Sequence, residues 1–595
     1  MVTLGISSFY HDSSATIIIN DKIIASAQEE RFTRIKHDNR FPLNAIDYCL
    51  KEAKVNLNQI DNIVYYENPS LKFLRIFKTN LMQLNFLFLF KFFLKFKNFL
   101  IKRKIKNILE NFYSQKLKKI QYNIHHHSHA LSTFIPSGFD EALVICFDGV
   151  GEFHSTTVWH AKKGKLKLLW KKNFPDSIGI IYSAFTYFCG FKVNFGEYKL
   201  MGLAPYGNPI YVDLIKKNIV KVYKNGDYKV NTKYFNFSSE KEIISKSFEN
   251  LFNVKKRNSE EKIKQIYMDI AASIQSVTEE IVFNICKTQA KITGLKKLCL
   301  SGGVALNCVS NGNIEKEKIF NDIWVQPASG DAGCSLGAAL IETKKLNEPF
   351  SPYLGPKFLD DEIDELLKLL HLQFKKYEKF ENLVFQISKN IQSGQIVGWF
   401  QGKMEFGPRA LGNRSILADP RNENIQSELN LKIKFRESFR PFAPIILEEE
   451  LVNYFDFKIK SPYMLFTSKI KNKFRINSIS KNLEGLEKIN EINSKFPGIT
   501  HVDFSSRLQT VSKKDNFRLY SLLKNFFETT ECPMLINTSF NVRSEPIVCT
   551  PLDAIKCFMN TNIDILVINN FVIEKKDINL NSLKDIKYLD QFDLD

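Results

Sequence analysis

The segment Leu143-Val-Ile-Cys-Phe-Asp-Gly-Val-Gly-Glu152 decides the fold, because it joins an apolar strand to an acidic loop that contains two glycines. Strands predicted at 156–160 and 166–170 follow it, separated by a tight turn at Lys162-Lys-Gly164. The same order of elements occurs at the start of the chain. A strand at 3–7 leads there into the polar turn Tyr10-His-Asp-Ser-Ser14, and strands at 15–19 and 23–27 follow.

These two copies, roughly 140 residues apart, predict an α/β fold with a duplicated half-domain and a cleft between the halves. The pattern is typical of the actin and sugar-kinase type, a ribonuclease H-like fold. In that superfamily the loops after the first strand of each half face one another around a nucleotide. Fold analogy alone does not set the chemistry.

Two further units of strand, glycine loop and helix follow a long helix predicted at 263–291 by its apolar spacing. Strands at 297–300 and 323–325 lead into Ser301-Gly-Gly-Val-Ala-Leu-Asn307 and Ser329-Gly-Asp-Ala-Gly-Cys-Ser-Leu-Gly337. Such loops expose backbone N–H groups to an anion, although a single one is as readily a plain turn. With the acidic loop they predict a nucleotide site at Gly149, Gly151, Gly302, Gly303, Asn307 and Gly330.

A histidine cluster, His125-His-His-Ser-His129, predicts a metal site. His125 and His129 are four residues apart, so on a helix they project from one face and can share one metal ion. We expect Asp148 and Asp331, each at the end of a strand or in a loop, to complete the site. Two imidazoles and two carboxylates suit Fe²⁺, with Zn²⁺ or Mn²⁺ as alternatives. The competing interpretation is a group of exposed or structural histidines.

The composition of the 595-residue chain, 44% hydrophobic and 25% charged, excludes a mostly disordered, fibrous or multi-spanning membrane protein. Its length predicts two large domains or more. The first twenty residues lack the pattern of a secretory signal, and the ten cysteines form no CxxC. We therefore expect reduced, buried thiols and a cytoplasmic location.

The net charge of +19 is concentrated in one basic, Phe-rich insertion, residues 70–119, where thirteen Lys and Arg face the single acid Glu110. This segment supplies +12 and leaves +7 for the rest of the chain, which argues against a nucleic-acid partner. Its lysines interrupt the apolar runs too often for a membrane span. We predict two amphipathic helices that cover their own domain, and membrane-surface contact is the less favoured alternative.

Several motifs in order resemble the O-carbamoyltransferases of nodulation-factor and antibiotic biosynthesis. They are the histidine cluster, the acidic loop, both glycine loops, Lys199-Leu-Met-Gly-Leu-Ala-Pro-Tyr-Gly207, Gly407-Pro-Arg-Ala-Leu-Gly-Asn-Arg-Ser415, Lys434-Phe-Arg-Glu-Ser-Phe-Arg-Pro-Phe-Ala443 and Asn537-Thr-Ser-Phe-Asn541. The resemblance implies a metal-dependent carbamoyl-transfer domain at 1–355, similar to the tRNA threonylcarbamoyladenosine transferases. It also implies an α/β domain at 376–595, similar to the threonylcarbamoyl-adenylate synthases, and a linker at 356–375.

A basic cluster in the C-terminal half predicts a second anion site. Arginine forks bind phosphate oxygens, so these side chains suit carbamoyl phosphate and the triphosphate of Mg²⁺-bound ATP. The predicted residues are Arg409, Arg414, Lys434 and Arg440, and Arg507, Ser539 and Asn541 resemble further nucleotide-site positions of the family. The alternative is a solvated basic face paired with Glu405, Asp419, Glu423, Glu428 and Glu437.

The resemblance implies ATP-dependent formation of carbamoyl-adenylate from carbamoyl phosphate, followed by transfer to a hydroxyl of a sugar or secondary metabolite. We assign catalytic roles to Arg409 and Lys434 in the first step and to His11, beside Asp12, as the base of the second. A structural turn histidine is the competing interpretation of His11.

Three other functions stay open: a sugar-kinase-like ATPase, a tRNA threonylcarbamoyl-type enzyme and a membrane-docked scaffold. A sugar-kinase-like ATPase would leave the arginine-rich C-terminal domain without a role. A tRNA-modifying enzyme would need a basic surface for RNA, which the chain lacks outside the insertion. We expect the acceptor pocket to be built from the insertion and from residues 210–260. The acceptor itself cannot be read from the sequence, and a homodimer is an open alternative.

Overall fold

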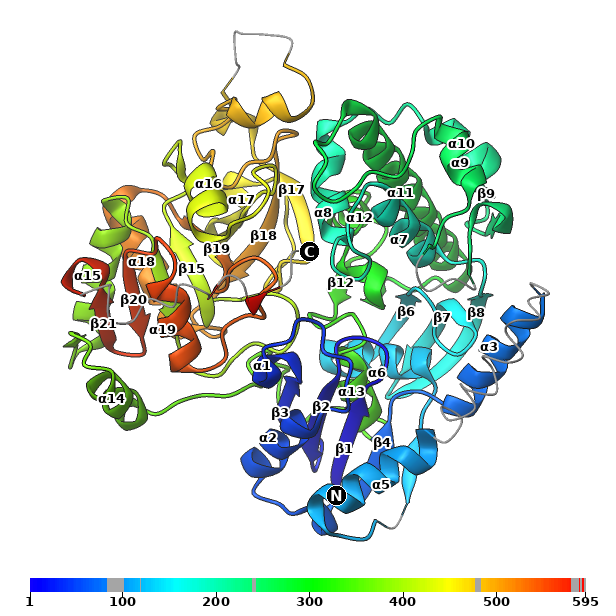
Figure 1. Cartoon of the computed structure of the whole chain (residues 1–595), viewed down its shortest axis with the longest axis horizontal. Coiled ribbons are helices and arrows are strands. Elements are labelled where there is room, and N and C mark those ends of the chain that lie inside the picture. Colours follow the sequence, from blue (N-terminus) through cyan, green and yellow to red (C-terminus); the bar gives the residue numbers. More distant parts are fainter. Residues whose placement is uncertain are drawn as a thin grey trace.

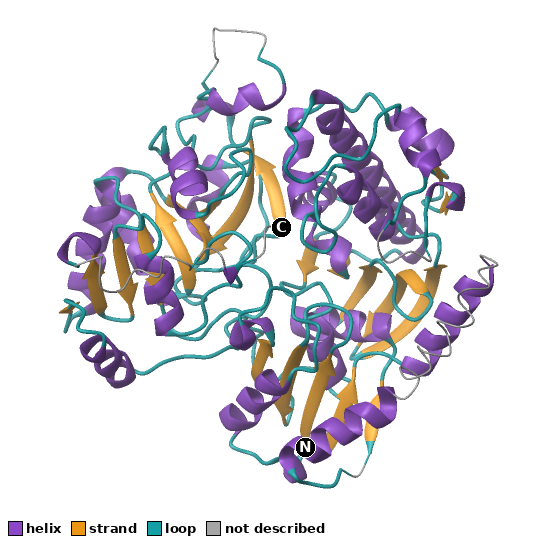
Figure 2. Ribbon diagram, viewed as in Figure 1, coloured by secondary structure: helices purple, strands orange, loops and turns teal. Residues whose placement is uncertain are grey.

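The computed structural model of the chain describes residues 1–82, 101–117, 119–237, 242–476, 483–578, 588 and 591–592. Among the described residues, two five-stranded sheets and a two-stranded one belong to the N-terminal part, and a nine-stranded sheet forms the C-terminal part (Figure 1). Strands make up the interior of each part and helices pack around them (Figure 2).

The strands of the N-terminal part are β1 (Val2–Ser7), β2 (Ser14–Ile19), β3 (Lys22–Gln28), β4 (Asn62–Tyr65), β5 (Ile120–Tyr122), β6 (Glu141–Phe147), β7 (His154–Lys162), β8 (Lys165–Asn173), β11 (Lys297–Ser301) and β12 (Asp322–Val325). One sheet has the order β3-β2-β1-β4-β5 and the other β8-β7-β6-β11-β12. In each sheet three antiparallel strands are extended by two parallel ones. The predicted duplication is confirmed by this shared topology.

Helices α6 (His125–Ser137) and α13 (Gly333–Ala339) lie between the two sheets. Close backbone approach requires glycine at two of their contacts. A Cβ atom on Gly337 would lie 1.8 Å from the carbonyl oxygen of Ser128 in α6. A Cβ on Gly5 would lie 2.0 Å from the carbonyl oxygen of Ser335 in α13. The metal-ligand candidates on α6 are therefore held on a tightly packed layer.

A helical region covers the second sheet and includes the long helix predicted from apolar spacing, α11 (Gln265–Thr293). Its other elements are α7 (Ile178–Phe188), α8 (Glu197–Leu203), α9 (Val212–Asn218), β9 (Val220–Val222), β10 (Tyr228–Val230), α10 (Lys246–Phe252) and α12 (Cys308–Lys316). Helices α1 (Glu30–Thr33) and α2 (Leu43–Ala53) accompany the first sheet.

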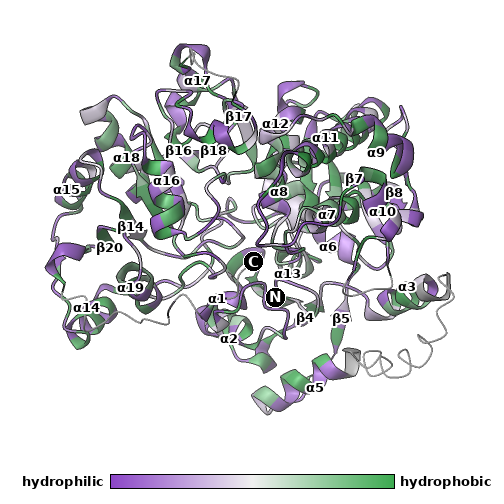
Figure 3. Cartoon of the chain, turned by 45° about the horizontal axis from the view of Figure 1, so that its top comes forward, coloured by the Kyte–Doolittle hydropathy of each residue, from purple (hydrophilic) through white to green (hydrophobic). Residues whose placement is uncertain are grey.

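Two helices of the insertion are described, α3 (Pro69–Met82) and α5 (Ile101–Tyr113), and residues 83–100 and 118 lie outside the described residues. Helix α5 buries Ile105 and Leu109 in the core of the first half-domain, as a packed cover would. Both helices carry hydrophobic and hydrophilic residues at the margin of the molecule (Figure 3). Within the described part of the chain, no helix has the length and apolarity needed to span a bilayer.

The strands of the C-terminal part are β13 (Lys375–Lys376), β14 (Val397–Phe400), β15 (Arg414–Ala418), β16 (Ala443–Leu447), β17 (Phe466–Lys469), β18 (Ser505–Val511), β19 (Met534–Ser539), β20 (Ile565–Ile568) and β21 (Phe571–Glu574). They form a mixed sheet in the order β13-β21-β20-β14-β15-β19-β16-β18-β17. Its helices are α15 (Phe380–Gln392), α16 (Ile425–Glu428), α17 (Leu451–Tyr454), α18 (Phe517–Thr530) and α19 (Pro551–Met559).

The segment expected to be a linker, 356–375, contains a helix, α14 (Asp360–Leu369). Ile363 and Leu367 on this helix are fully buried, so the segment packs onto the C-terminal part. Its acidic first residues lie at the helix N-terminus, where negative charge is stabilising.

Direct contacts join the N-terminal and C-terminal parts. Arg34 Nη2 lies 2.8 Å from Glu545 Oε1, and Lys199 Nζ lies 3.2 Å from Glu437 Oε1. A Cβ on Gly312 would lie 2.2 Å from the carbonyl oxygen of Thr467, which shows backbone-level packing between α12 and β17. The parts therefore form one packed unit, and a cavity lies between them.

Candidate active site

The four side chains predicted to bind a metal meet at one point. His125 Nε2 lies 3.0 Å from His129 Nε2, 3.5 Å from Asp148 Oδ2 and 3.4 Å from Asp331 Oδ1. The two histidines are one turn apart on α6, Asp148 directly follows β6, and Asp331 directly precedes the α13 region. The fold thus gathers ligand atoms from three separate segments.

The chemistry of this donor set fits a divalent transition metal. Metal bonds of about 2.1 Å to nitrogen and oxygen place neighbouring ligand atoms about 3.0–3.4 Å apart, close to the distances observed. The buried Asp331 Oδ2 has no hydrogen-bond partner, as expected of an atom that faces a cation. Cys334 Sγ lies within 4.8 Å of the ligand atoms of His125, His129 and Asp331, and burial raises the pKa of its thiol well above the usual value.

Groups behind the ligands orient them. The backbone N–H of Gly303 donates to Asp148 Oδ1 at 3.1 Å, and Ser301 Oγ lies 3.2 Å from His129 Nδ1. The Glu152 carboxylate accepts the backbone N–H of His125 at 3.0 Å, at the first residue of α6. Such supporting contacts fix the ring orientation of metal-binding histidines.

The remaining histidines of the cluster have structural partners. His126 Nδ1 lies 2.9 Å from Thr157 Oγ1, and His127 Nδ1 lies 2.9 Å from Asn123 Oδ1. Burial lowers the pKa of both imidazoles, so they are neutral at pH 7. The structural interpretation therefore applies to His126 and His127, and His125 and His129 stay the predicted metal ligands.

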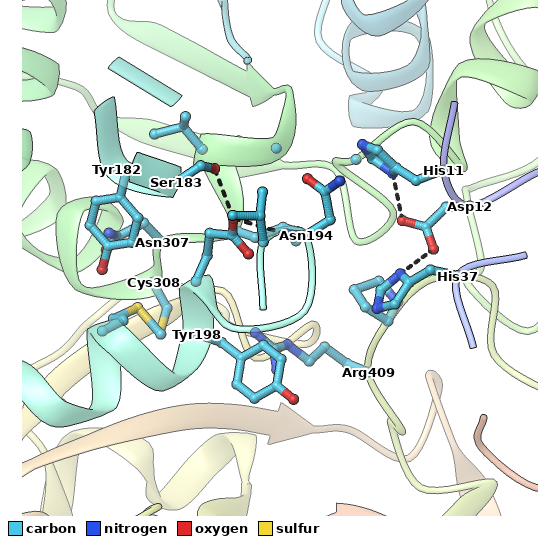
Figure 4. A pocket seen from close by; sticks show the side chains of 18 of the residues that line it. His11, Asp12, His37, Tyr182, Ser183, Asn194, Tyr198, Asn307, Cys308 and Arg409 are labelled. Atoms are coloured by element: carbon cyan, nitrogen blue, oxygen red, sulfur yellow. Dashed lines mark hydrogen bonds and ion pairs between the residues drawn. The ribbon is translucent and has the colours of Figure 1, made fainter. Parts of the chain in front are cut away.

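His11 points toward Asp12 and lies close to His37 on the wall of the cavity (Figure 4). Its Nδ1 is 2.9 Å from Asp12 Oδ2, and its Nε2 is 3.9 Å from Asp331 Oδ2. Asp12 also contacts His37 Nδ1 at 2.6 Å, so it bridges two imidazoles. Burial disfavours the charged ring, but the nearby carboxylates of Asp331 and Asp12 outweigh it and raise the pKa of His11 to about 9.

The glycine loops divide into residues that line the cavity and residues that allow close packing. Gly149, Gly303, Asn307 and Gly330 line the cavity. Gly302 does not: its φ is +90°, and a Cβ there would lie 2.1 Å from the carbonyl oxygen of Phe147. Gly151 packs against His125, where a Cβ would lie at 3.0 Å from the histidine Cβ. These two glycines position the loops and do not face the cavity.

An arginine cluster lines the C-terminal side of the same cavity: Arg409, Arg436, Arg440 and Arg507. Arg440 pairs with Glu437 at 3.6 Å, whereas Arg409, Arg436 and Arg507 have no ion pair within the part of the chain that the structure describes. Burial and the charge of Arg409 lower the pKa of Arg507 to about 9. The cluster is therefore an excess of half-buried positive charge, which suits a polyanion.

The acidic residues that could have paired with this cluster are mostly engaged elsewhere. Glu405 accepts backbone N–H groups of Leu411 and Asn413 at 2.7 and 2.8 Å. Asp419 pairs with Arg421 at 2.5 Å and Glu428 with Lys432 at 3.3 Å. The alternative of a solvated, neutralised basic face is thus not what the structure contains.

Lys434 lies between Ser539 and Asn541, the other two predicted nucleotide-site residues. Its Nζ donates to Asn541 Oδ1 at 2.7 Å, to the Asn541 carbonyl at 2.9 Å, and to Ser539. Burial holds the pKa of the amine well below its usual value. A π-helical turn, Leu429–Ile433, precedes it, and Phe435 has a φ of +49°, an irregular backbone of the kind that recurs at functional sites.

Arg414 does not line the cavity, contrary to its predicted place in the nucleotide site. Its guanidinium donates to the carbonyls of Gln401 at 2.6 Å and Pro356 at 2.9 Å, and it stacks on the ring of Phe400 at 3.6 Å. The side chain is fully buried among these partners, because β15 places it on the inner face of the sheet. Its role is to hold the segment before α14.

One cavity of about 1420 Å³ joins both groups of residues. His11, Asp12, Asp148 and the glycine loops lie on its N-terminal side, and Arg409, Lys434, Arg440, Arg507, Ser539 and Asn541 lie on its C-terminal side. Figure 4 shows Arg409 beside Tyr198 and Cys308 of the N-terminal part. The insertion and the 210–260 region also contribute, through Arg75, Ile76, Phe237 and Ile243.

Sequence reasoning missed several residues of this site. Arg436 belongs to the basic cluster that the sequence predicts, but no individual role was assigned to it, and Cys334 follows Asp331 in the second glycine loop. Glu67, 3.9 Å from His125 Nδ1, ends an apolar strand, the same signal that identified Asp148. His37 gave no signal, because only the fold brings it to Asp12.

Comparison with known proteins agrees with this geometry. Residues 2–340 match the family model "Carbamoyltransferase N-terminus" and residues 388–575 match "Carbamoyltransferase C-terminus". The uncharacterized protein sll1178 of Synechocystis sp. is 46% identical over 100% of this chain and 99% of its own length. Nodulation protein NolNO of Sinorhizobium fredii is 34% identical over 96% of this chain and 80% of its own.

Among solved structures, component A of the Acidaminococcus fermentans (R)-2-hydroxyglutaryl-CoA dehydratase aligns with 57% of this chain and 96% of its own, at a TM-score of 0.29 and 14% identity. The two family models together cover the metal cluster, the glycine loops and the arginine cluster. The chain therefore belongs to the carbamoyltransferase family, and it is an enzyme of that class.

Proposed function

We propose that this chain makes carbamoyl-adenylate from carbamoyl phosphate and ATP and transfers the carbamoyl group to a hydroxyl of a sugar or secondary metabolite. The observation that carries the proposal is a cavity whose C-terminal wall holds the arginine cluster and whose N-terminal wall holds Asp148, the metal-ligand candidate that lies 3.5 Å from His125 Nε2. Each group of residues suits one half of such a reaction.

The arginine side suits the activation step. Water would hydrolyse carbamoyl phosphate to carbamate and inorganic phosphate. An oxygen of the carbamate would then attack the α-phosphorus of Mg²⁺-bound ATP, and pyrophosphate would leave. Arg409, Arg436 and Arg507 supply half-buried positive charge for the phosphates of both substrates. Lys434 lies in the same wall, and its Nζ holds Ser539 and Asn541 in place there.

The metal side suits the transfer step. A divalent metal held by His125, His129, Asp148 and Asp331, of which Fe²⁺ is our candidate, would supply Lewis-acid polarisation of the carbamoyl oxygen. The acceptor oxygen would attack the carbamoyl carbon, AMP would leave, and His11 would take the acceptor proton. While the carboxylates of Asp148 and Asp331 carry their full negative charge, His11 is protonated and cannot accept a proton. It can act as the base only when a bound cation balances these two carboxylates.

The buried, unpaired thiols of the ten cysteines support a cytosolic location for this reaction. Burial raises the pKa of each of these thiols, so they are poor nucleophiles at neutral pH. None of them is assigned a role in the transfer.

Product analysis tests the proposal. Purified protein with carbamoyl phosphate, Mg²⁺ and ATP should release pyrophosphate and inorganic phosphate, and it should release AMP once an acceptor hydroxyl is present. ADP formation with carbamoyl phosphate untouched would support the sugar-kinase-like alternative instead. Dependence of the reaction on added tRNA would support the threonylcarbamoyl-type alternative.

A further inference from the structure

The cavity extends beyond His11 and Asp148 into a lobe whose residues have no role in the steps described so far. Helix α3 of the insertion contributes Arg75, Ile76 and Thr79 to it, and Phe174 follows β8. Phe237 and Ile243 complete this wall. The whole cavity, about 1420 Å³, exceeds the roughly 300–1,000 Å³ of an ordinary small-molecule site, so it has room for an acceptor beside the nucleotide.

Arg75 brings an unpaired charge to this lobe. It is half-buried, and no carboxylate forms an ion pair with it among the residues that the structure describes. The nearest acids are engaged: Glu67 accepts Lys72 Nζ at 2.8 Å, and Glu152 accepts the backbone N–H of Asn68 at 2.7 Å. Burial lowers the pKa of Arg75, which shows that its surroundings do not fully compensate the charge.

The lobe adjoins the site of transfer. Tyr10 lies next to His11, with 4.7 Å between the ring centroids, and both line the cavity. Partial burial and the carboxylates of Asp331 and Asp148 together raise the pKa of Tyr10 to about 12, and Arg75 opposes them. The phenol is therefore close enough to sense both the metal cluster and Arg75. A ligand held by Arg75 can present a hydroxyl near His11.

The wall beside Arg75 is aromatic. The guanidinium carbon lies 5.8 Å from the ring centroid of Phe174, and the rings of Phe174 and Phe237 meet edge to face at 5.0 Å. Aromatic faces pack against the apolar C–H face of a sugar ring, and a guanidinium binds carboxylate or phosphate oxygens. This combination selects a ring that carries both hydroxyls and an anion.

We propose that the acceptor is a hydroxylated sugar with a carboxylate or phosphate group, and that Arg75 binds this anion while the sugar ring packs on Phe174. The inference rests on the proposed carbamoyl transfer and names the class of its acceptor. It also gives the insertion a role, since α3 carries the residue that selects the substrate.

Binding of three matched probes to the full-length protein tests the proposal: glucose, glucuronate and glucose 1-phosphate, titrated by saturation-transfer NMR. One of the two anionic sugars should bind at least about tenfold more tightly than glucose, as expected for one charge-assisted contact. Tighter binding of glucuronate identifies a sugar acid, and tighter binding of glucose 1-phosphate identifies a sugar phosphate.

Variants of α3 make the test specific. Arg75→Leu should abolish the preference for the anionic probe, and Arg75→Lys should retain part of it. Lys78→Leu, at an exposed position of the same helix outside the cavity, should leave it unchanged. Equal affinity for the three sugars, or a preference that survives Arg75→Leu, would overturn the proposal.

The proposed function has its own readout. Pyrophosphate release from ATP and carbamoyl phosphate needs no acceptor, so its absence would count against carbamoyl-adenylate formation alone. Pyrophosphate release without any preference for an anionic sugar would count against the acceptor assignment alone.

Discussion

Replacement of Arg409 by methionine should lower activity and raise stability at the same time. Arg409 is half-buried, its buried Nε has no hydrogen-bond partner, and Arg440 is close enough to lower its pKa further. In the ligand-free protein this charge lowers the free energy of unfolding. With ATP and carbamoyl phosphate bound, the same charge becomes a phosphate ligand.

The magnitudes follow from these two states. Loss of one charge-assisted hydrogen bond to phosphate costs about 1.5–3 kcal/mol, which lowers the rate of pyrophosphate release by about one to two powers of ten. Removal of an unpaired, half-buried charge at a binding site stabilises the free protein by about 0.5–2 kcal/mol. The ligand-free variant should therefore unfold at higher urea concentration than the parent.

Two assays on the same preparation check this prediction: pyrophosphate release without acceptor, and urea unfolding with and without ATP. Arg421→Met is the matched control, because Arg421 pairs with Asp419 outside the cavity. The control should keep its pyrophosphate release. A less stable Arg409→Met protein with unchanged pyrophosphate release would refute the assignment of Arg409 to a phosphate site.

Three further predictions follow from the site. His125→Ala should lower bound metal, measured by elemental analysis, together with carbamoyl transfer, and unchanged metal content would refute the assigned ligands. Glu30→Gln leaves Arg31, its partner at 2.8 Å, buried and unpaired, so the free energy of unfolding at pH 7 should fall by about 3–5 kcal/mol. Burial raises the pKa of Glu30, but Arg31, Lys36 and His37 outweigh it and hold the pKa below its ordinary 4.5. The difference in free energy of unfolding between the parent protein and Glu30→Gln, measured by urea titration, should therefore shrink below that pH. A difference that is constant with pH contradicts the reasoning. Gly302→Ala should lower both the melting temperature and transfer, because its Cβ would meet the Phe147 carbonyl at 2.1 Å; a variant with unchanged melting temperature would show that the loop is not constrained.

Local patterns were sufficient to predict the duplicated sheets and the side chains that lie together around His125. The repeated strands carry their own turns, and a helix places His125 and His129 on one face wherever it lies in the fold. Asp148 was found because it is a polar residue directly beyond a buried strand, and Asp331 because it lies in the second glycine loop.

Features that depend on packing between distant segments could not be predicted this way. The motif around Arg414 gave no indication that β15 turns this side chain into the core while Arg409 faces the cavity. The segment 356–375 was taken for a linker from its prolines and acids, yet Ile363 and Leu367 were enough to fold it as a buried helix. The pairing of Asp12 with His37 depends on two loops of the first half-domain that pack together. The joining of both sites in one cavity depends on how the two parts of the chain dock.

The central claim, that one cavity divides its work between the arginine cluster and the metal cluster, is tested most directly by separating the half-reactions. Two reactions are measured for both Arg409→Met and Asp331→Ala. Pyrophosphate release is followed with ATP and carbamoyl phosphate, and acceptor carbamoylation is followed with supplied carbamoyl-adenylate. The account predicts that Asp331→Ala still releases pyrophosphate but does not carbamoylate the acceptor, and that Arg409→Met carbamoylates the acceptor from supplied adenylate but releases little pyrophosphate. Loss of the same half-reaction in both variants would contradict it.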